Sequence, residues 1–344
     1  MKIFIGKNLL SRIDRLFDFS RFSKIAILTD ENIPNLLANK INKSLNKEII
    51  KIIIPAGEKG KNIETVKKIW EKMFGKGLDR QSLLINLGGG VICDMGGFAA
   101  STFMRGIKFL NIPTTLLSQV DASVGGKTGI DFLEIKNGIG VFNNPIGTII
   151  DVETLRTLPR REFISAFGEI IKHGVISGRK HFDLVTAKKP EEFNQGELIK
   201  IIKQSVKIKS NIVKKDPKEK DLRKILNFGH TIGHVIESLS WKTNRHLLHG
   251  EAVAIGMVAE SQIANLSGIL LKKDFETIKK SLINTGLPTR IENINSEDIK
   301  KIILSDKKNN RGIIKWSLPE KIGEVLANIN VREDLVIKAI KSTI

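Results

Sequence analysis

The chain of 344 residues contains one cysteine, Cys93, and no tyrosine. A single thiol excludes an internal disulfide framework and any zinc site built from several cysteines, so a metal site would need histidine and carboxylate ligands. No apolar run approaches the roughly 20 residues that a bilayer-spanning helix requires, and the N-terminal residues lack the apolar core of a signal peptide. We therefore expect a cytoplasmic protein with no membrane partner.

Acidic residues are scarce relative to basic ones, with 37 Asp and Glu against 56 Lys and Arg and a formal net charge of +19. Such an excess can indicate nucleic-acid binding, because Lys and Arg side chains release counterions from polyanions. The lysines are spread along the whole chain, however, and aromatic residues, which would stack on bases, make up only 6% of it. We expect no nucleic-acid partner, and we interpret the charge as compositional bias together with attraction of anionic substrates.

Length and hydrophobic pattern together predict two domains. In the first part of the chain, β-branched runs alternate with amphipathic stretches, which is typical of βαβ units and a parallel sheet. Strands are expected at 24–29, 49–54, 82–87, 107–112 and 147–150. Helical periodicity follows, with helices expected at 160–178, 195–215, 222–241, 249–268 and 272–285. We therefore predict an α/β domain over residues 1–151 and a mainly α-helical domain over 152–344.

A glycine-rich turn follows one of the expected strands. Gly88-Gly89-Gly90 lies between that strand and an apolar helical pattern, where backbone N–H groups favour an anion such as a pyrophosphate. Asp94, in the next helical turn, can accept hydrogen bonds from a ribose or substrate hydroxyl. A purely structural turn would use the same glycines. Cys93 stands at the third glycine position of G-x-G-x-x-G, and we interpret it as a small buried hydrophobe.

Residues 105–137 hold an unusual density of polar side chains beside glycines. Gly126-Lys127-Thr128 resembles the end of a Walker A loop, but Asp121 stands where the first glycine of that motif is required, which excludes a P-loop. Lysines on consecutive turns at one end of a sheet favour instead a pocket for a phosphorylated, polyhydroxylated substrate, although any single exposed lysine is as often only solubilising.

Three histidines and a glutamate form a candidate metal site. His230 and His234 lie four residues apart on one face of an expected helix, and His249 follows at a helix start. Threonine, not glutamate, follows His230, which excludes an H-E-x-x-H protease. Glu169 lies in an apolar stretch and needs a partner, either a metal or Lys172. Two histidines and a carboxylate with an open position suit catalytic zinc, but hydrogen bonding within a helical core explains the spacing equally well.

Several long motifs together resemble the 3-dehydroquinate synthases, and the similarity extends nearly from end to end. The matching segments are 87–91, 96–102, 104–106, 112–121, 124–128, 136–137, 157–159, 227–234 and 248–253. The resemblance implies an N-terminal Rossmann-like domain that binds NAD and a C-terminal α-helical domain that holds a zinc or cobalt ion. It also implies an active site in the cleft between the domains and a homodimer.

The resemblance also implies a role for individual residues. The implied metal ligands are Glu169, His230 and His249, which leaves His234 for hydrogen bonding. The implied NAD contacts are Asp30, Asn32, Glu58, Lys61, Gly89, Gly90, Asp94, Thr114, Thr115, Lys127, Lys136, Thr154 and Thr157. The substrate phosphate would contact Lys127, Asn137, Asn227 and His234, with Arg105 of the partner subunit. The substrate hydroxyls and carboxylate would contact Asp121, Lys172, Lys209, Arg223 and Lys307.

The implied reaction converts 3-deoxy-D-arabino-heptulosonate 7-phosphate into 3-dehydroquinate and phosphate, a step of the shikimate pathway to aromatic amino acids. It would run through transient oxidation by NAD, phosphate elimination, re-reduction, ring opening and an intramolecular aldol reaction. One rival is a metal-dependent polyol or alcohol dehydrogenase, a class that usually has aspartate where this chain has Glu169. The other is a cyclase of sedoheptulose 7-phosphate, whose substrate would offer Arg223 and Lys209 no carboxylate.

Overall fold

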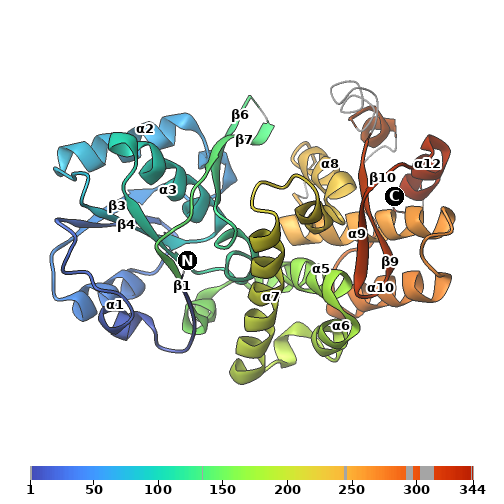
Figure 1. Ribbon diagram of the computed structural model, residues 1–344, viewed down its shortest axis with the longest axis horizontal. Helices are drawn as coiled ribbons and strands as arrows, with labels where there is room; N and C mark the ends of the chain where they lie inside the picture. The colour runs from blue at the N-terminus through green and yellow to red at the C-terminus, as the bar shows by residue number, and fades with distance from the viewer. Residues whose placement is uncertain are drawn as a thin grey trace. The chain divides into compact units, whose positions relative to one another are not determined.

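The computed structural model describes residues 2–133, 135–243, 246–291, 297–302, 314–341 and 343. The chain divides into two compact units, Met1–Leu158 and Pro159–Ile344 (Figure 1). The boundary predicted from the sequence, after residue 151, lies just before the short helix η5 (Val152–Thr157). Asp151 caps η5 by accepting a hydrogen bond from the Glu153 N–H at 3.1 Å. Because this cap belongs to the last strand of the sheet, η5 is part of the first unit.

The first unit is built on a six-stranded parallel sheet with the order β1-β8-β5-β4-β2-β3. The strands are β1 (Lys2–Gly6), β2 (Ile25–Asp30), β3 (Ile49–Ile54), β4 (Leu83–Gly88), β5 (Lys108–Pro113) and β8 (Gly147–Asp151). The sequence predicts all of these except β1 to within one residue. β1 is a half-exposed edge strand, and its weaker apolar signal does not stand out from the sequence.

Helices cover both faces of this sheet (Figure 1). In β2, Ala26 and Leu28 pack into one apolar cluster with α2 (Ile63–Gly75) and α3 (Gly90–Thr102). Ile25 and Ile27 pack into the opposite cluster with α1 (Asn35–Leu45) and η1 (Leu10–Arg15). A strand buried on both faces has no polar alternation, which explains the uninterrupted apolar runs in the sequence.

Short elements at the ends of the strands complete this unit. They are η2 (Glu58–Gly60), η3 (Phe103–Arg105), the π-helical turn η4 (Ser118–Ala122) and an antiparallel hairpin of β6 (Lys127–Phe132) and β7 (Ile135–Phe142). The hairpin is absent from the predicted strands, because its glycines and lysines are typical of a loop. It carries two of the predicted cofactor residues, Lys127 and Lys136, together with Asn137.

The second unit is mainly α-helical, as predicted. Its helices are α4 (Arg160–Ser165), α5 (Phe167–Ser177), α6 (Arg179–Thr186), η6 (Pro190–Glu192), α7 (Gln195–Lys215), η7 (Leu222–Asn227), α8 (His230–Ser240), α9 (His249–Leu266), α10 (Lys272–Thr285) and α12 (Glu333–Lys341). An antiparallel pair, β9 (Trp316–Lys321) and β10 (Glu324–Ile329), was not predicted. None of the helices in the described part of the chain combines the length and the apolarity that a membrane crossing demands.

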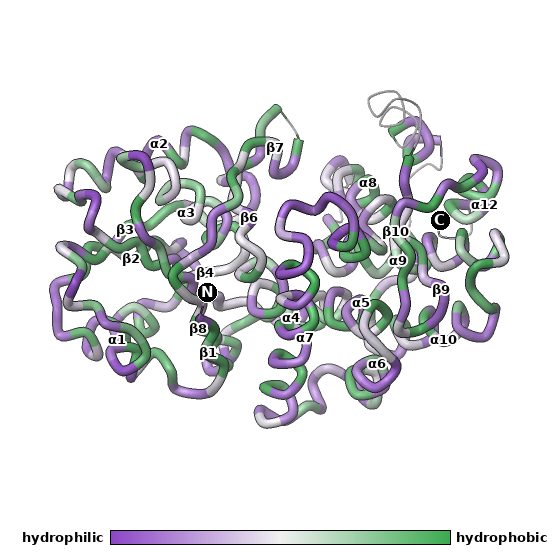
Figure 2. The backbone as a smooth tube through the Cα atoms, viewed as in Figure 1, coloured by the Kyte–Doolittle hydropathy of each residue, from purple (hydrophilic) through white to green (hydrophobic). Residues whose placement is uncertain are grey.

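Helix α9 is the centre of this unit, buried along most of its length and packed against α5, α8, α10 and α12. The helix predicted at 222–241 is two elements, because Gly229 has a φ of +83° and interrupts the helical path between η7 and α8. The helix predicted at 160–178 is likewise divided into α4 and α5. The connection from α7 to η7 is strongly hydrophilic (Figure 2).

Candidate functional site

A buried carboxylate and two imidazole rings face one another in the second unit. Glu169, in the first turn of α5, has no solvent-exposed surface. Its Oε1 lies 3.3 Å from Nε2 of His230 and 3.5 Å from Nε2 of His249. Its Oε2 lies 2.5 Å from Nζ of Lys172, one helical turn along α5. The partner that the sequence requires for Glu169 is therefore present as Lys172, and two candidate metal ligands meet the same carboxylate.

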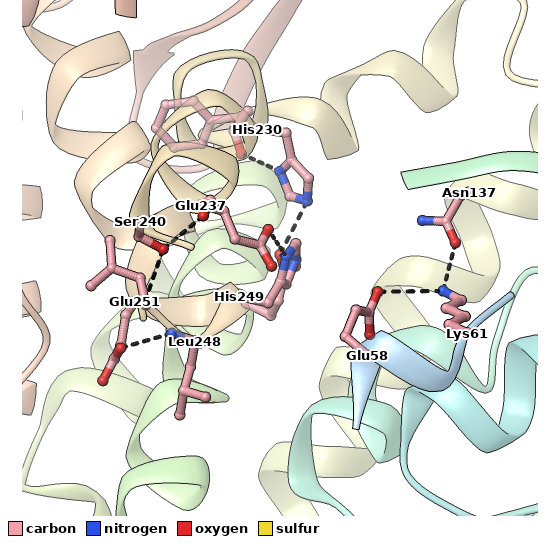
Figure 3. A network of polar contacts seen from close by, with 12 residues as sticks. Glu58, Lys61, Asn137, His230, Glu237, Ser240, Leu248, His249 and Glu251 are labelled. Atoms are coloured by element: carbon pink, nitrogen blue, oxygen red, sulfur yellow. Dashed lines mark hydrogen bonds and ion pairs between the residues drawn. The ribbon is translucent and has the colours of Figure 1, made fainter. Parts of the chain in front are cut away.

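The other nitrogen of each ring contacts an acceptor. Nδ1 of His249 lies 3.2 Å from Oε2 of Glu237, and these two side chains point toward each other in Figure 3. Nδ1 of His230 lies 3.2 Å from the carbonyl oxygen of Phe228. In metal sites a histidine ligand usually donates its second N–H in this way, which fixes the ring orientation and leaves the first nitrogen for the metal. Sequence reasoning missed Glu237.

The rings of His230 and His249 differ in pKa and therefore in charge. Burial and the charge of Lys172 lower the pKa of His230 well below its usual value, so this ring is neutral. Burial acts in the same direction on His249, but hydrogen bonds to Glu169 and Glu237 outweigh it and raise the pKa of His249 to about 10. Burial also opposes ionisation of Glu169, yet the charges of Lys172 and the rings lower the pKa of this carboxyl well below its usual value.

This donor set fits a divalent metal ion. His230, His234 and His249 each present a nitrogen within 4.8 Å of the others, and Glu169 adds an ionised oxygen. Imidazole nitrogens with one carboxylate are ligands that zinc and cobalt accept, with an open position for a substrate oxygen. The fold brings all four candidate ligands together. His234, on α8, differs from the other three residues in being exposed to solvent.

Two further predicted residues lie on η7 and contact the hydrophilic connection from α7. The Arg223 guanidinium, which is buried, donates a hydrogen bond to the carbonyl of Pro217 at 2.8 Å. The Asn227 amide donates to Oε1 of Glu219 at 2.8 Å. Of the remaining candidates in this unit, Lys209 is buried on α7 and Lys307 lies outside the described residues.

In the first unit, a buried lysine joins three segments whose residues the family resemblance assigns to cofactor or substrate binding. Nζ of Lys61 lies 2.7 Å from Oδ2 of Asp94 on α3 and 2.6 Å from Oδ1 of Asn137 on β7. Oε1 of Glu58 on η2 lies 3.9 Å from the same nitrogen (Figure 3). Burial would lower the pKa of Lys61, but Asp94 and Glu58 outweigh it and raise this pKa. Lys61 is therefore a charged connection between η2, α3 and the hairpin.

The other residues predicted to contact cofactor or substrate in this unit occupy strand ends and the turns that follow them. Asp30 ends β2 and Asn32 follows it, Gly89 and Gly90 begin α3 directly after β4, Thr114 and Thr115 follow β5, and Thr154 and Thr157 lie in η5; Asp121 lies in η4 and the exposed Arg105 ends η3. The carboxyl ends of parallel strands are where open α/β sheets bind ligands. Cys93 is buried in α3, and burial raises the pKa of its thiol, as suits a small hydrophobe.

Comparison with known proteins decides the family. Residues 51–165 match the model of the 3-dehydroquinate synthase N-terminal domain, and residues 166–309 match that of the C-terminal domain. The chain is 44% identical over 342 residues to a 3-dehydroquinate synthase of Thermodesulfovibrio yellowstonii, which covers 97% of this chain and 95% of that one. The chain belongs to the 3-dehydroquinate synthase family.

Two solved structures are similar to this member of the 3-dehydroquinate synthase family over 99% of its length and 96% of theirs. One is 2-deoxy-scyllo-inosose synthase complexed with carbaglucose-6-phosphate, NAD+ and Co2+, with a TM-score of 0.90 and 23% identity. The other is 2-epi-5-epi-valiolone synthase from Streptomyces hygroscopicus with NAD+ and Zn2+ bound, with a TM-score of 0.89 and 25% identity. The predicted fold, a parallel α/β domain followed by an α-helical domain, is confirmed.

Proposed function

We propose that the protein is a 3-dehydroquinate synthase that converts 3-deoxy-D-arabino-heptulosonate 7-phosphate into 3-dehydroquinate and phosphate. The observation that carries the proposal is the buried Glu169 carboxylate, faced by Nε2 of His230 and of His249, in a chain 44% identical to a 3-dehydroquinate synthase. The cofactors would be NAD and one zinc or cobalt ion. The protein would act in the cytoplasm as a homodimer.

Glu169, His230 and His249 would hold the metal, which supplies Lewis-acid polarisation of a substrate hydroxyl when it is bound. NAD supplies a transient hydride acceptor, and its site would be formed by the strand-end residues of the first unit with Lys61, Lys127 and Lys136. Lys172, held by Glu169 at 2.5 Å, would stabilise negative charge that develops on the substrate oxygen. The residues of the chain therefore act mainly by positioning and by charge stabilisation.

The cationic and amide side chains would bind the two anionic ends of the substrate. For the phosphate we propose Lys127, Asn137, Asn227 and His234, with Arg105 of the partner subunit; for the carboxylate and hydroxyls we propose Asp121, Lys209, Arg223 and Lys307. The backbone at Arg105 supports its part in this proposal, because φ of +70° at an exposed arginine is a strained conformation of the kind found at functional sites.

An assay of the zinc-loaded protein with the heptulosonate phosphate tests the reaction, with phosphate and bulk NADH measured together. Phosphate release without NADH accumulation is the expected result, because the hydride returns to the substrate within one turnover. NADH accumulation with a polyol and no phosphate release would identify a dehydrogenase instead. Faster phosphate release from sedoheptulose 7-phosphate than from the heptulosonate would identify the other cyclase activity.

Replacing Arg223 by alanine should weaken substrate binding and spare the metal. A charge-assisted hydrogen bond contributes about 1.5–3 kcal/mol, so KM for the heptulosonate phosphate should rise roughly ten- to a hundredfold. Zinc content should stay at the wild-type level. Arg179→Ala is a suitable control, because Arg179 is an exposed arginine paired with Asp183. An unchanged KM, or a loss of zinc, would contradict the role of Arg223 as a substrate contact.

Zinc binding should release a proton. His249 has a pKa of about 10, so below that pH the metal-free ring carries protons on both nitrogens. A metal on Nε2 displaces one of them, so zinc affinity should fall about tenfold for each pH unit lowered across the neutral range. Calorimetry in buffers of different ionisation enthalpy counts the released protons. A zinc affinity independent of pH would speak against His249 as a ligand.

A further inference from the structure

A second buried carboxyl group, that of Glu260 on α9, contacts the start of α8. Its Oε2 accepts a hydrogen bond from the Gly229 N–H at 2.6 Å, and its Oε1 accepts one from the Ile232 N–H at 3.1 Å. The side chain has no solvent-exposed surface. Glu260 therefore binds the backbone of the residues on either side of His230.

These contacts replace the usual cap of a helix. The first N–H groups of an α-helix have no partner within the helix, and a side chain at the preceding residue commonly accepts from them. In α8 that residue is Gly229, which has no side chain. A Cβ at this position would lie 2.6 Å from Cγ of Met257, so no other residue fits without a shift. The cap of α8 comes instead from the neighbouring helix α9.

The contact between Glu237 and His249 is the counterpart of this cap. Glu237 is on α8, and its Oε2 lies 3.2 Å from Nδ1 of His249, the first residue of α9. Glu260 is on α9 and accepts hydrogen bonds from backbone N–H groups on either side of His230, the first residue of α8. The two helices pack against each other at close range, since a Cβ at Gly256 would lie 2.0 Å from the carbonyl oxygen of Gly229. A glutamate of α8 therefore contacts the histidine that begins α9, and a glutamate of α9 contacts the backbone around the histidine that begins α8.

We propose that Glu237 and Glu260 form a reciprocal clamp that sets the positions of His249 and His230 for metal binding. The inference rests on the proposed function, because it takes these two histidines as metal ligands. Neither glutamate is a ligand in the proposed site; both act through the histidine or its backbone. Their effect should therefore be seen in the affinity and the coordination geometry of the metal.

Four variants test the clamp. Glu237→Leu and Glu260→Met remove the acceptors at similar volume, whereas Glu237→Gln and Glu260→Gln each keep one acceptor oxygen. Partners of this kind typically change metal affinity about 10- to 100-fold, so the Leu and Met variants should bind zinc more weakly by that factor. The Gln variants should recover part of the loss. Ser261→Ala is the control, because Ser261 is the next residue on α9 and is also fully buried.

Zinc affinity is measured by competition with a chromophoric chelator, and geometry by the visible absorption spectrum of the cobalt-loaded protein. A merely structural role would lower the thermal stability of the metal-free protein and leave the affinity and the spectrum of the folded fraction unchanged. That result would overturn the clamp. If Glu260→Met does not fold, Glu260→Gln decides by the same two measurements. A wild-type protein that binds neither zinc nor cobalt would refute the proposed function itself, which separates the two failures.

Discussion

Replacing His249 by alanine should deprive the protein of its divalent metal. The variant loses one of two nitrogen ligands opposite Glu169, and structural zinc binding is worth about 10–16 kcal/mol over four ligands. One ligand then accounts for about 3 kcal/mol, so zinc should bind roughly a hundredfold more weakly or worse. Atomic absorption after dialysis measures the zinc per chain, and chelator competition measures the affinity. Activity with the heptulosonate phosphate should fall with the metal content.

His234→Ala is the matched control for this variant. His234 also presents a ring nitrogen within 4.8 Å of the other two histidines, so geometry alone leaves it as a candidate ligand. The proposed assignment gives it to the substrate phosphate. His234→Ala should therefore retain zinc and lose activity. The reverse pattern, with zinc lost from His234→Ala and retained by His249→Ala, would show that the ligand assignment is wrong.

Replacing Lys172 by methionine should destabilise the metal-free protein strongly. The Lys172 ammonium lies 2.5 Å from a carboxylate oxygen of Glu169, and both side chains are buried. Removing one partner of a buried ion pair leaves an uncompensated charge and typically costs about 3–5 kcal/mol. Zinc at the proposed site would supply positive charge to the same carboxylate, so added zinc should restore much of the loss. Urea unfolding with and without zinc measures both effects.

A surface ion pair is the control for Lys172. Lys188 lies 2.8 Å from Glu197, and both side chains are partly exposed. Exposed pairs contribute at most about 1 kcal/mol, so Lys188→Met should change the free energy of unfolding little, with or without zinc. Equal effects of the two substitutions, or a loss at Lys172 that zinc does not reduce, would contradict a metal site at Glu169.

The central contact of the candidate site could be predicted from sequence by one physical rule. Glu169 lies among apolar residues, and a buried carboxylate needs a partner. The same rule points to Glu260, which lies in the apolar helix α9, but it cannot name the partner: backbone N–H groups at the start of another helix. Glu237 gives no such signal, because its role depends on how α8 and α9 pack. Spacing along the chain does not contain that information.

The fold, like the site, could be predicted from the sequence only in part. Strands buried on both faces are continuous β-branched runs and could be predicted, whereas the hairpin of β6 and β7 is rich in glycine, and β9 contains Pro319. Proline and glycine weaken the pattern of a strand, so pairing with a neighbour decides such segments. The interruption at Gly229 also depends on tertiary structure, because it follows from the positive φ and the close approach of Met257.

The position of Lys61 has a consequence for the lifetime of the cofactor complex. One buried ammonium already joins Glu58, Asp94 and Asn137, so η2, α3 and the hairpin, which carry proposed NAD contacts, are connected by a charge of the protein itself. Binding to an ordered site avoids the entropy loss of fixing loops, and the gain is seen mainly as slower dissociation. A reaction that returns its hydride within one turnover requires NAD to remain in place between the two transfers. A long residence time, more than a fast association, is what this lysine would provide.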